Sequence, residues 1–288
     1  MKTTQSLLPA AAVLAITLLA GAAHAADWNG PQEPFALYGN TYYVGTAGLS
    51  AVLITSPAGH ILVDGATPEA AEPIARHIRQ LGFRIEDVRY ILSSHEHGDH
   101  AGGIAGLQKM SGATVLASPA AEKVLRTGQP DKGDPQYKDL DPMTPVAHTR
   151  AVRDGEVVKL GPIAVTARFT PGHTRGGTSW TWRATEGEKT VDIVYADSLN
   201  AVSSDGASFS RNPGYPAARA DLERSMATVA GFKCDVLVSA HPEFSGLWER
   251  KAKQASMGNA AFIDPEACRK YVANARERLA KKIADEKI

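Results

Sequence analysis

The chain has 288 residues, 43% of them hydrophobic, and its 31 basic and 31 acidic side chains give a formal net charge of zero. This length is enough for one large domain or two fused halves with a sizeable core. The balanced charge offers no electrostatic attraction to nucleic acid or to an anionic membrane surface. A small molecule is therefore the expected partner.

The N-terminal residues have the composition of a secretory signal peptide. Lys2 precedes an apolar run over 7–20, and small residues follow, ending in Ala-His-Ala at Ala25. A basic start, a short apolar core and an A-x-A site predict export with cleavage after Ala25. The apolar run is short for a membrane span, which argues against an anchor. We expect a periplasmic or secreted protein whose mature domain is 26–288, a monomer that does not insert into the membrane after cleavage.

The first part of the mature chain alternates strand-like and helix-like patterns. Strands are expected at 38–44, 51–55, 61–64 and 88–92. A helix is expected to start at Thr67-Pro68, with Thr67 as N-cap and Pro68 in the first helical position, and to stop at Gly82. The strand at 88–92 leads directly into a group of histidines.

The second part repeats this alternation. Strands are expected at 157–160, 163–169, 178–182, 191–195 and 236–239, and helices at 217–229 and 267–282. Strands followed by helices, twice over, predict two packed sheets with helices outside, in halves of about 30–150 and 151–288. The span 127–145 is rich in Pro, Gly, Asp and Lys, so we expect a long loop with a role at a site.

Cys234 and Cys268 are the only cysteines. An even count in an exported chain predicts a disulfide, whereas two unrelated buried thiols are the alternative. The bond would close a loop of roughly 35 residues and contribute about 3–4 kcal/mol of stability. Neither cysteine has a second Cys or His beside it at the spacing of zinc ligands.

Most of the candidate metal ligands lie in one segment, Ser-His-Glu-His-Gly-Asp-His at 94–100. His95 and His97, two residues apart in extended chain, face the same side and can bind one metal ion. A turn at Gly98 lets Asp99 and His100 face a neighbouring position, just before a helix expected near residue 101. Three imidazoles and a carboxylate this close together suit zinc, whereas a solvated polar loop or a single structural metal is the alternative.

Two further histidines complete the set. His173 and His241 each lie just past an expected strand, where side chains can converge at one end of a sheet. Together with the cluster at 95–100 they make two groups of three ligands, enough for two metal ions.

This pattern resembles a known family. H-x-H-x-D-H at 95–100, Pro-Gly-His at 171–173 and a later strand-end histidine, His241, are similar to the metallo-β-lactamase superfamily, whose fold is a four-layer αββα sandwich. Segments 59–64, 172–178, 195–199 and 245–248 and the placement of the two cysteines resemble subclass B3 metallo-β-lactamases. The resemblance covers about residues 28–285.

The resemblance implies two zinc ions per chain. It assigns His95, His97 and His173 to the first ion, and Asp99, His100 and His241 to the second. Water between the two ions would be acidified to hydroxide and the substrate carbonyl polarised. Asp99 would orient that hydroxide and help to move a proton, which makes it the catalytic residue.

Two residues are expected to contact the substrate. Ser198 occupies the position of a zinc-binding cysteine in other subclasses, and its hydroxyl is expected to hold water or substrate. Asn200 stands where related enzymes present a Ser or Thr hydroxyl to the substrate carboxylate, and its amide can also donate a hydrogen bond. Glu96, between the paired histidines, is expected to face away from the first ion.

The function implied is that of an exported zinc β-lactamase opening penicillins, cephalosporins and carbapenems, and so conferring antibiotic resistance. A thioesterase similar to hydroxyacylglutathione hydrolases, or a lactonase, is the enzymatic alternative; in the thioesterases the aspartate aligned with Asp197 bridges the metals as a seventh ligand. An exported protein that binds zinc without turnover is the non-enzymatic alternative.

Overall fold

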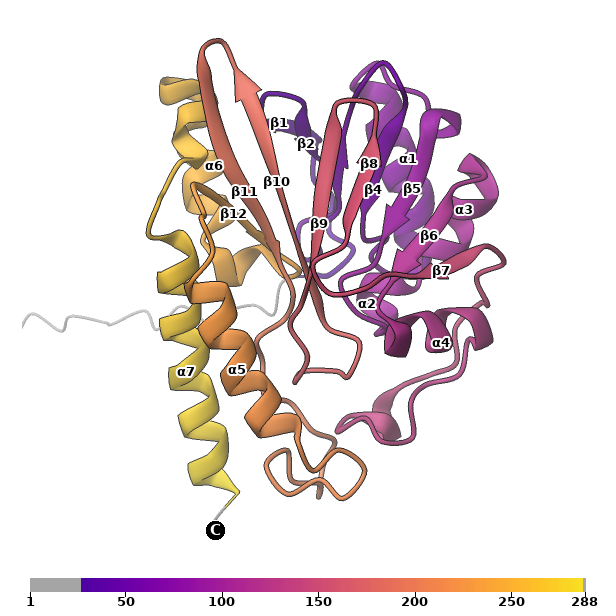
Figure 1. The fold of residues 1–288 in the computed structure, drawn as a ribbon, viewed down its shortest axis with the longest axis vertical. Coiled ribbons are helices and arrows are strands. Elements are labelled where there is room, and N and C mark those ends of the chain that lie inside the picture. The colour runs from indigo at the N-terminus through magenta and orange to yellow at the C-terminus, as the bar shows by residue number, and fades with distance from the viewer. Residues whose placement is uncertain (1–26, 287–288) are drawn as a thin grey trace, which may run out of the picture.

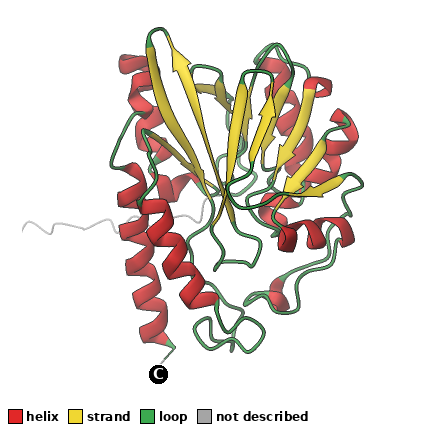
Figure 2. Cartoon of the chain, viewed as in Figure 1, coloured by secondary structure: helices red, strands yellow, loops and turns green. Residues whose placement is uncertain are grey.

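The computed structural model describes residues 27–286, so the predicted signal peptide at 1–25 lies outside the described residues. The described chain forms two β-sheets packed face to face with helices on both outer surfaces (Figures 1 and 2). The expected αββα sandwich is therefore confirmed. Within residues 27–286, no helix has the length and apolar character needed to cross a membrane.

The first sheet has seven strands in chain order: β1 (Phe35–Tyr38), β2 (Thr41–Tyr43), β3 (Val52–Ile54), β4 (His60–Val63), β5 (Val88–Leu92), β6 (Thr114–Ala117) and β7 (Thr149–Ala151). The second has five, in the order β12-β11-β10-β9-β8: β8 (Val157–Leu160), β9 (Ile163–Phe169), β10 (Thr178–Glu186), β11 (Lys189–Ala196) and β12 (Val236–Ser239). The helices are α1 (Ala71–Gln80), α2 (Gly98–Ala101), α3 (Ile104–Ser111), α4 (Pro119–Thr127), α5 (Ala218–Ala230), α6 (Leu247–Met257) and α7 (Ala267–Asp285).

Three apolar layers hold the sandwich together. The central layer fills the space between the sheets and includes Tyr43, Trp180 and Ile193, all fully buried. A second layer packs α1 and α3 against the first sheet, and a third packs α5 and α7 against the second. Because burial of apolar surface is the main favourable term in folding, these layers fix the relative position of the strand ends that carry the histidines.

Strand direction explains why functional residues gather at one edge. The pairs β4–β5, β5–β6 and β6–β7 are parallel, and so is β11–β12 in the second sheet. Carboxyl ends of parallel strands share an edge of the sheet, where ligand sites are commonly found in such folds. The segments after β5, β11 and β12 leave the sandwich there.

Three local expectations were wrong in detail. The single strand expected at 38–44 is instead the hairpin β1–β2, because Gly39 turns the chain with a φ of 52°. Helix α2 begins at Gly98 rather than near residue 101, so Asp99 and His100 lie in its single turn. Thr67 makes no side-chain cap; its hydroxyl donates to Asn29 Oδ1 at 2.6 Å, and Pro68 opens a short 3-10 helix, Pro68–Ala70, ahead of α1.

The disulfide is confirmed. Cys234 and Cys268 are bonded, and the bond joins the segment before β12 to the first turn of α7. It therefore ties the C-terminal helix to the strand that leads to His241.

Candidate active site

Three strand ends and one short helix bring the predicted ligands together. The segment after β5 carries His95 and His97, α2 carries Asp99 and His100, and the segments after β9 and β12 carry His173 and His241. All four segments lie beyond the ends of buried strands, so the apolar core sets their positions.

The first group consists of His95, His97 and His173. One ring nitrogen of each lies within 4.8 Å of the others, and all three side chains are buried. His95 Nε2 is buried with no hydrogen-bond partner among the described residues. A buried nitrogen left without a partner is costly, and a cation at the centre of the group would satisfy it. The residues present therefore fit a metal ion.

The second group consists of Asp99, His100 and His241. Asp99 Oδ2 lies 3.1 Å from His100 Nε2 and 3.4 Å from His241 Nε2, and the two Nε2 atoms are 3.2 Å apart. Two imidazole nitrogens and one carboxylate oxygen thus point at a single spot. His95, Asp99 and His100 also offer atoms within 4.8 Å of one another, so the two groups adjoin. Nitrogen and carboxylate ligands in groups of three, with room for water, are typical of catalytic zinc sites.

Burial sets the protonation of these groups. It lowers the pKa of His173 to about 3 and that of His95 well below its usual value, with further lowering by neighbouring histidines. Burial alone would raise the pKa of Asp99, but His100 and the hydrogen bonds from His100 and His241 hold it well below its usual range. At neutral pH, His95 and His173 are therefore neutral and Asp99 is ionised, which is the state that binds a cation.

Asp197 lies behind His95. Its Oδ1 is 2.8 Å from His95 Nδ1, while Nε2 is the nitrogen free for a metal, and both side chains are fully buried. Burial raises the pKa of Asp197 well above its usual value. In this position the carboxyl group orients the imidazole, as carboxylates behind metal-bound histidines commonly do. Among the described residues it joins neither group of converging ligand atoms, which argues against the bridging role of the thioesterase alternative.

Asp134 orients His97 as Asp197 orients His95. No local pattern in the sequence indicated this role for Asp134. His97 Nε2 donates to Asp134 Oδ2 at 3.0 Å, and Asp134 Oδ1 accepts from the backbone N–H of Gln136 at 2.7 Å. Burial alone would lower the pKa of His97, but the hydrogen bond and negative charge of Asp134 raise it. The ring is thereby turned so that Nδ1 faces the other histidines.

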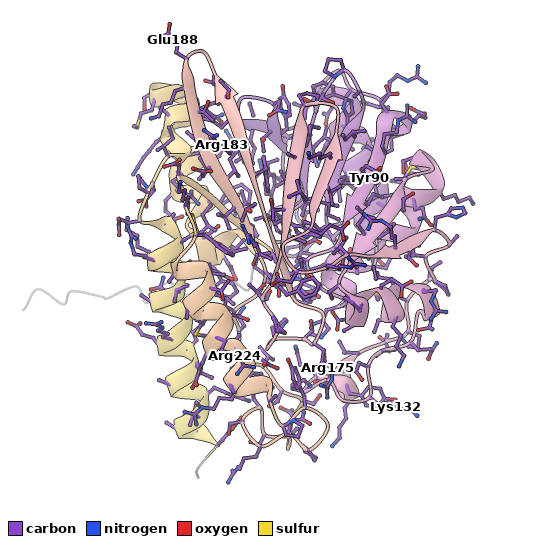
Figure 3. All side chains as sticks on the ribbon, viewed as in Figure 1. Tyr90, Lys132, Arg175, Arg183, Glu188 and Arg224 are labelled. Carbon is purple, nitrogen blue, oxygen red and sulfur yellow. A yellow bond between two sulfur atoms is a disulfide. The ribbon has the colours of Figure 1, made fainter. Side chains whose placement is uncertain are left out.

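The loop that carries Asp134 lies between α4 and β7, within the span expected to serve a site. An ion pair of 3.0 Å joins Asp131 to Arg175, and the Arg175 guanidinium lies 4.2 Å from the ring centre of Tyr215. Figure 3 shows Arg175 and Lys132 at the loop end of the sandwich. These contacts hold the loop against the segment that contains His173.

His173, the third histidine of the first group, is held by a backbone carbonyl group. His173 Nδ1 donates to the carbonyl oxygen of Asn200 at 2.9 Å. Glu96 is buried and accepts from Thr174 Oγ1 at 2.9 Å and from the N–H of Gly176 at 3.2 Å. It therefore faces away from the histidine group, as expected, and fixes the loop that follows His173.

A cavity of about 850 Å³ opens beside both groups. His97, Asp99, His173 and His241 lie in its wall, together with the loop residues 136 and 139–144 and with 200–202. Asn200 therefore faces the cavity. Ser198 is buried, with its hydroxyl unpartnered among the described residues, and is not part of the wall; its contact with substrate stays a prediction.

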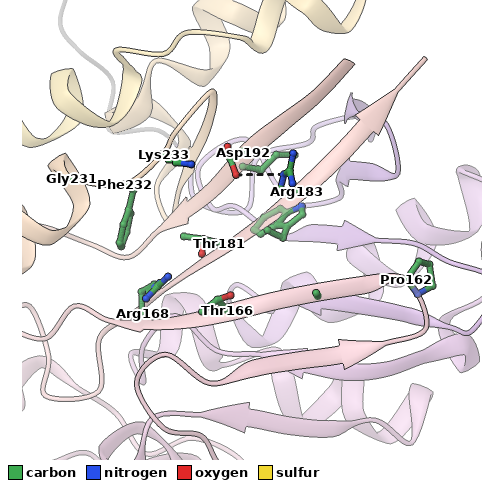
Figure 4. Close-up of a pocket in the computed structure, with 12 residues that line it drawn as sticks. Pro162, Thr166, Arg168, Thr181, Arg183, Asp192, Gly231, Phe232 and Lys233 are labelled. Atoms are coloured by element: carbon green, nitrogen blue, oxygen red, sulfur yellow. Dashed lines mark ion pairs between the residues drawn. The ribbon is translucent and has the colours of Figure 1, made fainter. Parts of the chain in front are cut away.

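A second hollow, of about 600 Å³, lies over strands β9, β10 and β11 (Figure 4). Arg168, Arg183 and Asp192 are in its lining, but none of the six predicted ligands is. We therefore take the cavity beside the histidine groups, and not this hollow, as the candidate active site.

Comparisons with known proteins agree with this geometry. The model of the metallo-beta-lactamase superfamily matches residues 45–189. The crystal structure of MEM-A1, a subclass B3 metallo-beta-lactamase from a soil metagenome library, is 66% identical with a TM-score of 0.89, over 90% of this chain and 98% of that one. Rm3 metallo-beta-lactamase is 53% identical with a TM-score of 0.89, over 91% and 97%, and SMB-1 is 51% identical with a TM-score of 0.88, over 90% and 99%.

Curated relatives are more distant. A hydroxyacylglutathione hydrolase of Cupriavidus taiwanensis is 28% identical over 208 residues, which is 69% of this chain and 66% of that protein. One from Rhodopseudomonas palustris is 30% identical over 122 residues, 42% of this chain and 38% of that protein. The matches thus span less than two thirds of these relatives. From its ligand geometry, its fold and these matches, the chain belongs to the metallo-β-lactamase superfamily and resembles the subclass B3 enzymes.

Proposed function

We propose that the protein is an exported zinc hydrolase that opens the β-lactam ring of penicillins, cephalosporins and carbapenems, and that it confers resistance to them. The observation that carries the proposal is the pair of adjoining ligand groups, two residues of each of which lie in the wall of one open cavity. The subclass B3 structures, at up to 66% identity over nearly their full length, support the substrate class.

The residues would hold two ions. His95, His97 and His173 would bind one, and Asp99, His100 and His241 the other. When bound, zinc supplies the charge that polarises the lactam carbonyl and acidifies the attacking water. Asp99 Oδ2 faces His100 and His241, which leaves Oδ1 to accept a hydrogen bond from that water and to take up its proton. No Ser-x-x-Lys motif of serine β-lactamases occurs in the sequence, so no acyl-enzyme is expected.

A substrate panel tests the proposal. Purified, zinc-loaded protein is given a penicillin, a cephalosporin, a carbapenem and a glutathione thioester, with and without EDTA. All three lactams should be opened, EDTA should abolish the activity and zinc should restore it. Clavulanate, which reacts with catalytic serines, should not inhibit. Rapid thioester cleavage with no loss of lactam absorbance would refute the proposal and favour the thioesterase.

A matched pair of variants tests the role of Asp99. Asp99→Asn should lower kcat by several orders of magnitude, since it removes a charged ligand and the group that orients the water. Asp139→Asn is the control, because Asp139 lines the same cavity, is exposed and belongs to neither ligand group. Equal activities of the two variants would contradict the role of Asp99.

Export is a separate part of the proposal and rests on residues 1–25. Mass spectrometry of the protein from a periplasmic fraction should find an N-terminus at Ala26. A protein that retains Met1 would contradict it. The mature protein is proposed to be a monomer, and its mass in solution, measured by light scattering, checks this.

A further inference from the structure

The cavity beside the ligand groups contains a single permanent cation. Arg278, from α7, is the one arginine in its wall, and the described wall has no lysine. Other charged residues around the opening, including Glu69, Asp141 and Glu243, are acidic. An anion that enters the cavity therefore finds one side chain there that attracts it, apart from the metal site itself.

Arg278 is held in place without a counter-ion. Its Nε donates to Asn200 Oδ1 at 2.8 Å, and its guanidinium lies 4.6 Å from the ring centre of Phe244. No carboxylate of the described residues is within ion-pair distance of it, and its Nη2 is buried without a partner. Burial lowers the pKa of Arg278, as expected for a charge that the protein has not compensated. Nη1 is neither paired nor buried among the described residues, so it is the nitrogen that an anion in the cavity can reach. A charged guanidinium N–H of this kind binds a carboxylate through a charge-assisted hydrogen bond.

The neighbours of Arg278 connect it to both ligand groups. Asn200 binds Arg278 with its side-chain oxygen and accepts from His173 Nδ1 with its backbone oxygen, at 2.9 Å. Phe244 lies under the guanidinium, and its ring centre is 5.8 Å from that of His241. The arginine is thus one residue away from a histidine of each group.

We propose that Arg278 binds the carboxylate of the substrate and that Asn200 is the positioning residue that holds it there. This inference rests on the proposed function. Penicillins, cephalosporins and carbapenems carry a carboxylate whose carbon is two bonds from the lactam nitrogen, so a cation near both ligand groups would orient the carbonyl toward them. Asn200 was expected to meet the carboxylate itself, but its side-chain oxygen is already used by Arg278.

The test measures how much the positive charge of Arg278 contributes to substrate binding. Arg278→Gln keeps a polar side chain and removes the charge; Arg276→Gln, on the same helix and exposed, is the matched control. Kinetics are measured with benzylpenicillin and with its methyl ester, which lacks the anion. The contact is present in both the ground state and the transition state, so Arg278→Gln should raise the KM for benzylpenicillin by about 10-fold to 100-fold with kcat nearly unchanged. For the ester, this variant and the wild type should be alike.

Two further variants keep the test decisive if Arg278→Gln fails to fold, as judged by its Tm and zinc content. Arg278→Lys should raise KM less than Arg278→Gln does, because it keeps the charge and loses only the planar guanidinium. Asn200→Ala should also raise KM by a smaller factor, because Arg278 loses the hydrogen bond that positions it. An unchanged KM for benzylpenicillin, or an equal loss on the ester, overturns the inference while the proposed function stands. If the wild type opens no β-lactam, both the inference and the proposed function are refuted.

Discussion

Removing the disulfide should cost the protein much of its stability and little of its chemistry. Cys234 and Cys268 are 34 positions apart and both are buried, while all six predicted ligands lie elsewhere. Closing a loop of this length in the unfolded chain lowers its entropy by about 13 cal/mol/K, which is about 4 kcal/mol at 25 °C. For a chain of this size, replacing both cysteines by alanine should lower Tm by about 8–16 °C.

Urea unfolding, followed by circular dichroism with and without reductant, measures this loss. The wild type should lose stability on reduction, whereas Cys234→Ala/Cys268→Ala should be unaffected by reductant, and this isolates the bond from the lost packing of the two side chains. Thiol labelling of the unfolded, unreduced wild type should find no free thiol. The reasoning is refuted if reduction leaves the unfolding midpoint of the wild type where it was.

Three further predictions concern the ligand groups. His241→Ala should retain about one zinc ion per chain where the wild type has two, measured by elemental analysis; full occupancy would mean that His241 is not a ligand. Asp134→Asn should weaken zinc binding by about 10-fold to 100-fold, measured by competition with a chelator, because His97 loses its charged partner; an unchanged affinity would contradict that role. The zinc-free protein should lose stability as pH falls from about 6.5 toward 3, since the pKa values of His95 and His173 are lowered in the folded state and the unfolded chain therefore binds more protons. His97, whose pKa is raised, offsets part of this loss. Urea unfolding should give a lower free energy of unfolding at pH 5 than at pH 7, and a higher one would contradict the prediction.

The parts of the site that the sequence predicted are those with local signals. His95, His97, Asp99 and His100 lie within six positions, and His173 and His241 each follow an apolar strand. The pattern was enough to expect that they converge, although the strand ends were expected at one end of a sheet and in fact come from both sheets. The structure brings these six residues together, and their roles as ligands are proposals.

The residues that the sequence did not reveal act across long separations. Asp134 lies in a loop of polar residues, and its aspartate differs in no visible way from Asp131 or Asp139 nearby. Arg278 is one of several basic residues on α7, and only packing places it in the cavity. Helical spacing cannot distinguish it from the exposed Arg276.

Most errors in the predicted fold concern short elements. The hairpin at Gly39 was expected as one strand because its flanking residues are apolar and aromatic, although Gly-Asn is itself a turn signal. Strands β6 and β7 were not expected; they have four and three residues, too few to show a period. Helices α4 and α6 were not expected either, although Ser118-Pro119 before α4 is a helix-start signal.

The ligand groups draw residues from both sheets, since His95 follows β5 of the first and His173 and His241 follow β9 and β12 of the second. An ion bound to either group would therefore be a cross-link between the two layers. An ion that binds only the folded chain adds to the stability that the core and the disulfide supply: free zinc at 100 times the dissociation constant would add about 2.7 kcal/mol. Loss of zinc would then remove the metal chemistry and also weaken the attachment between the two sheets, which would expose the chain to proteases.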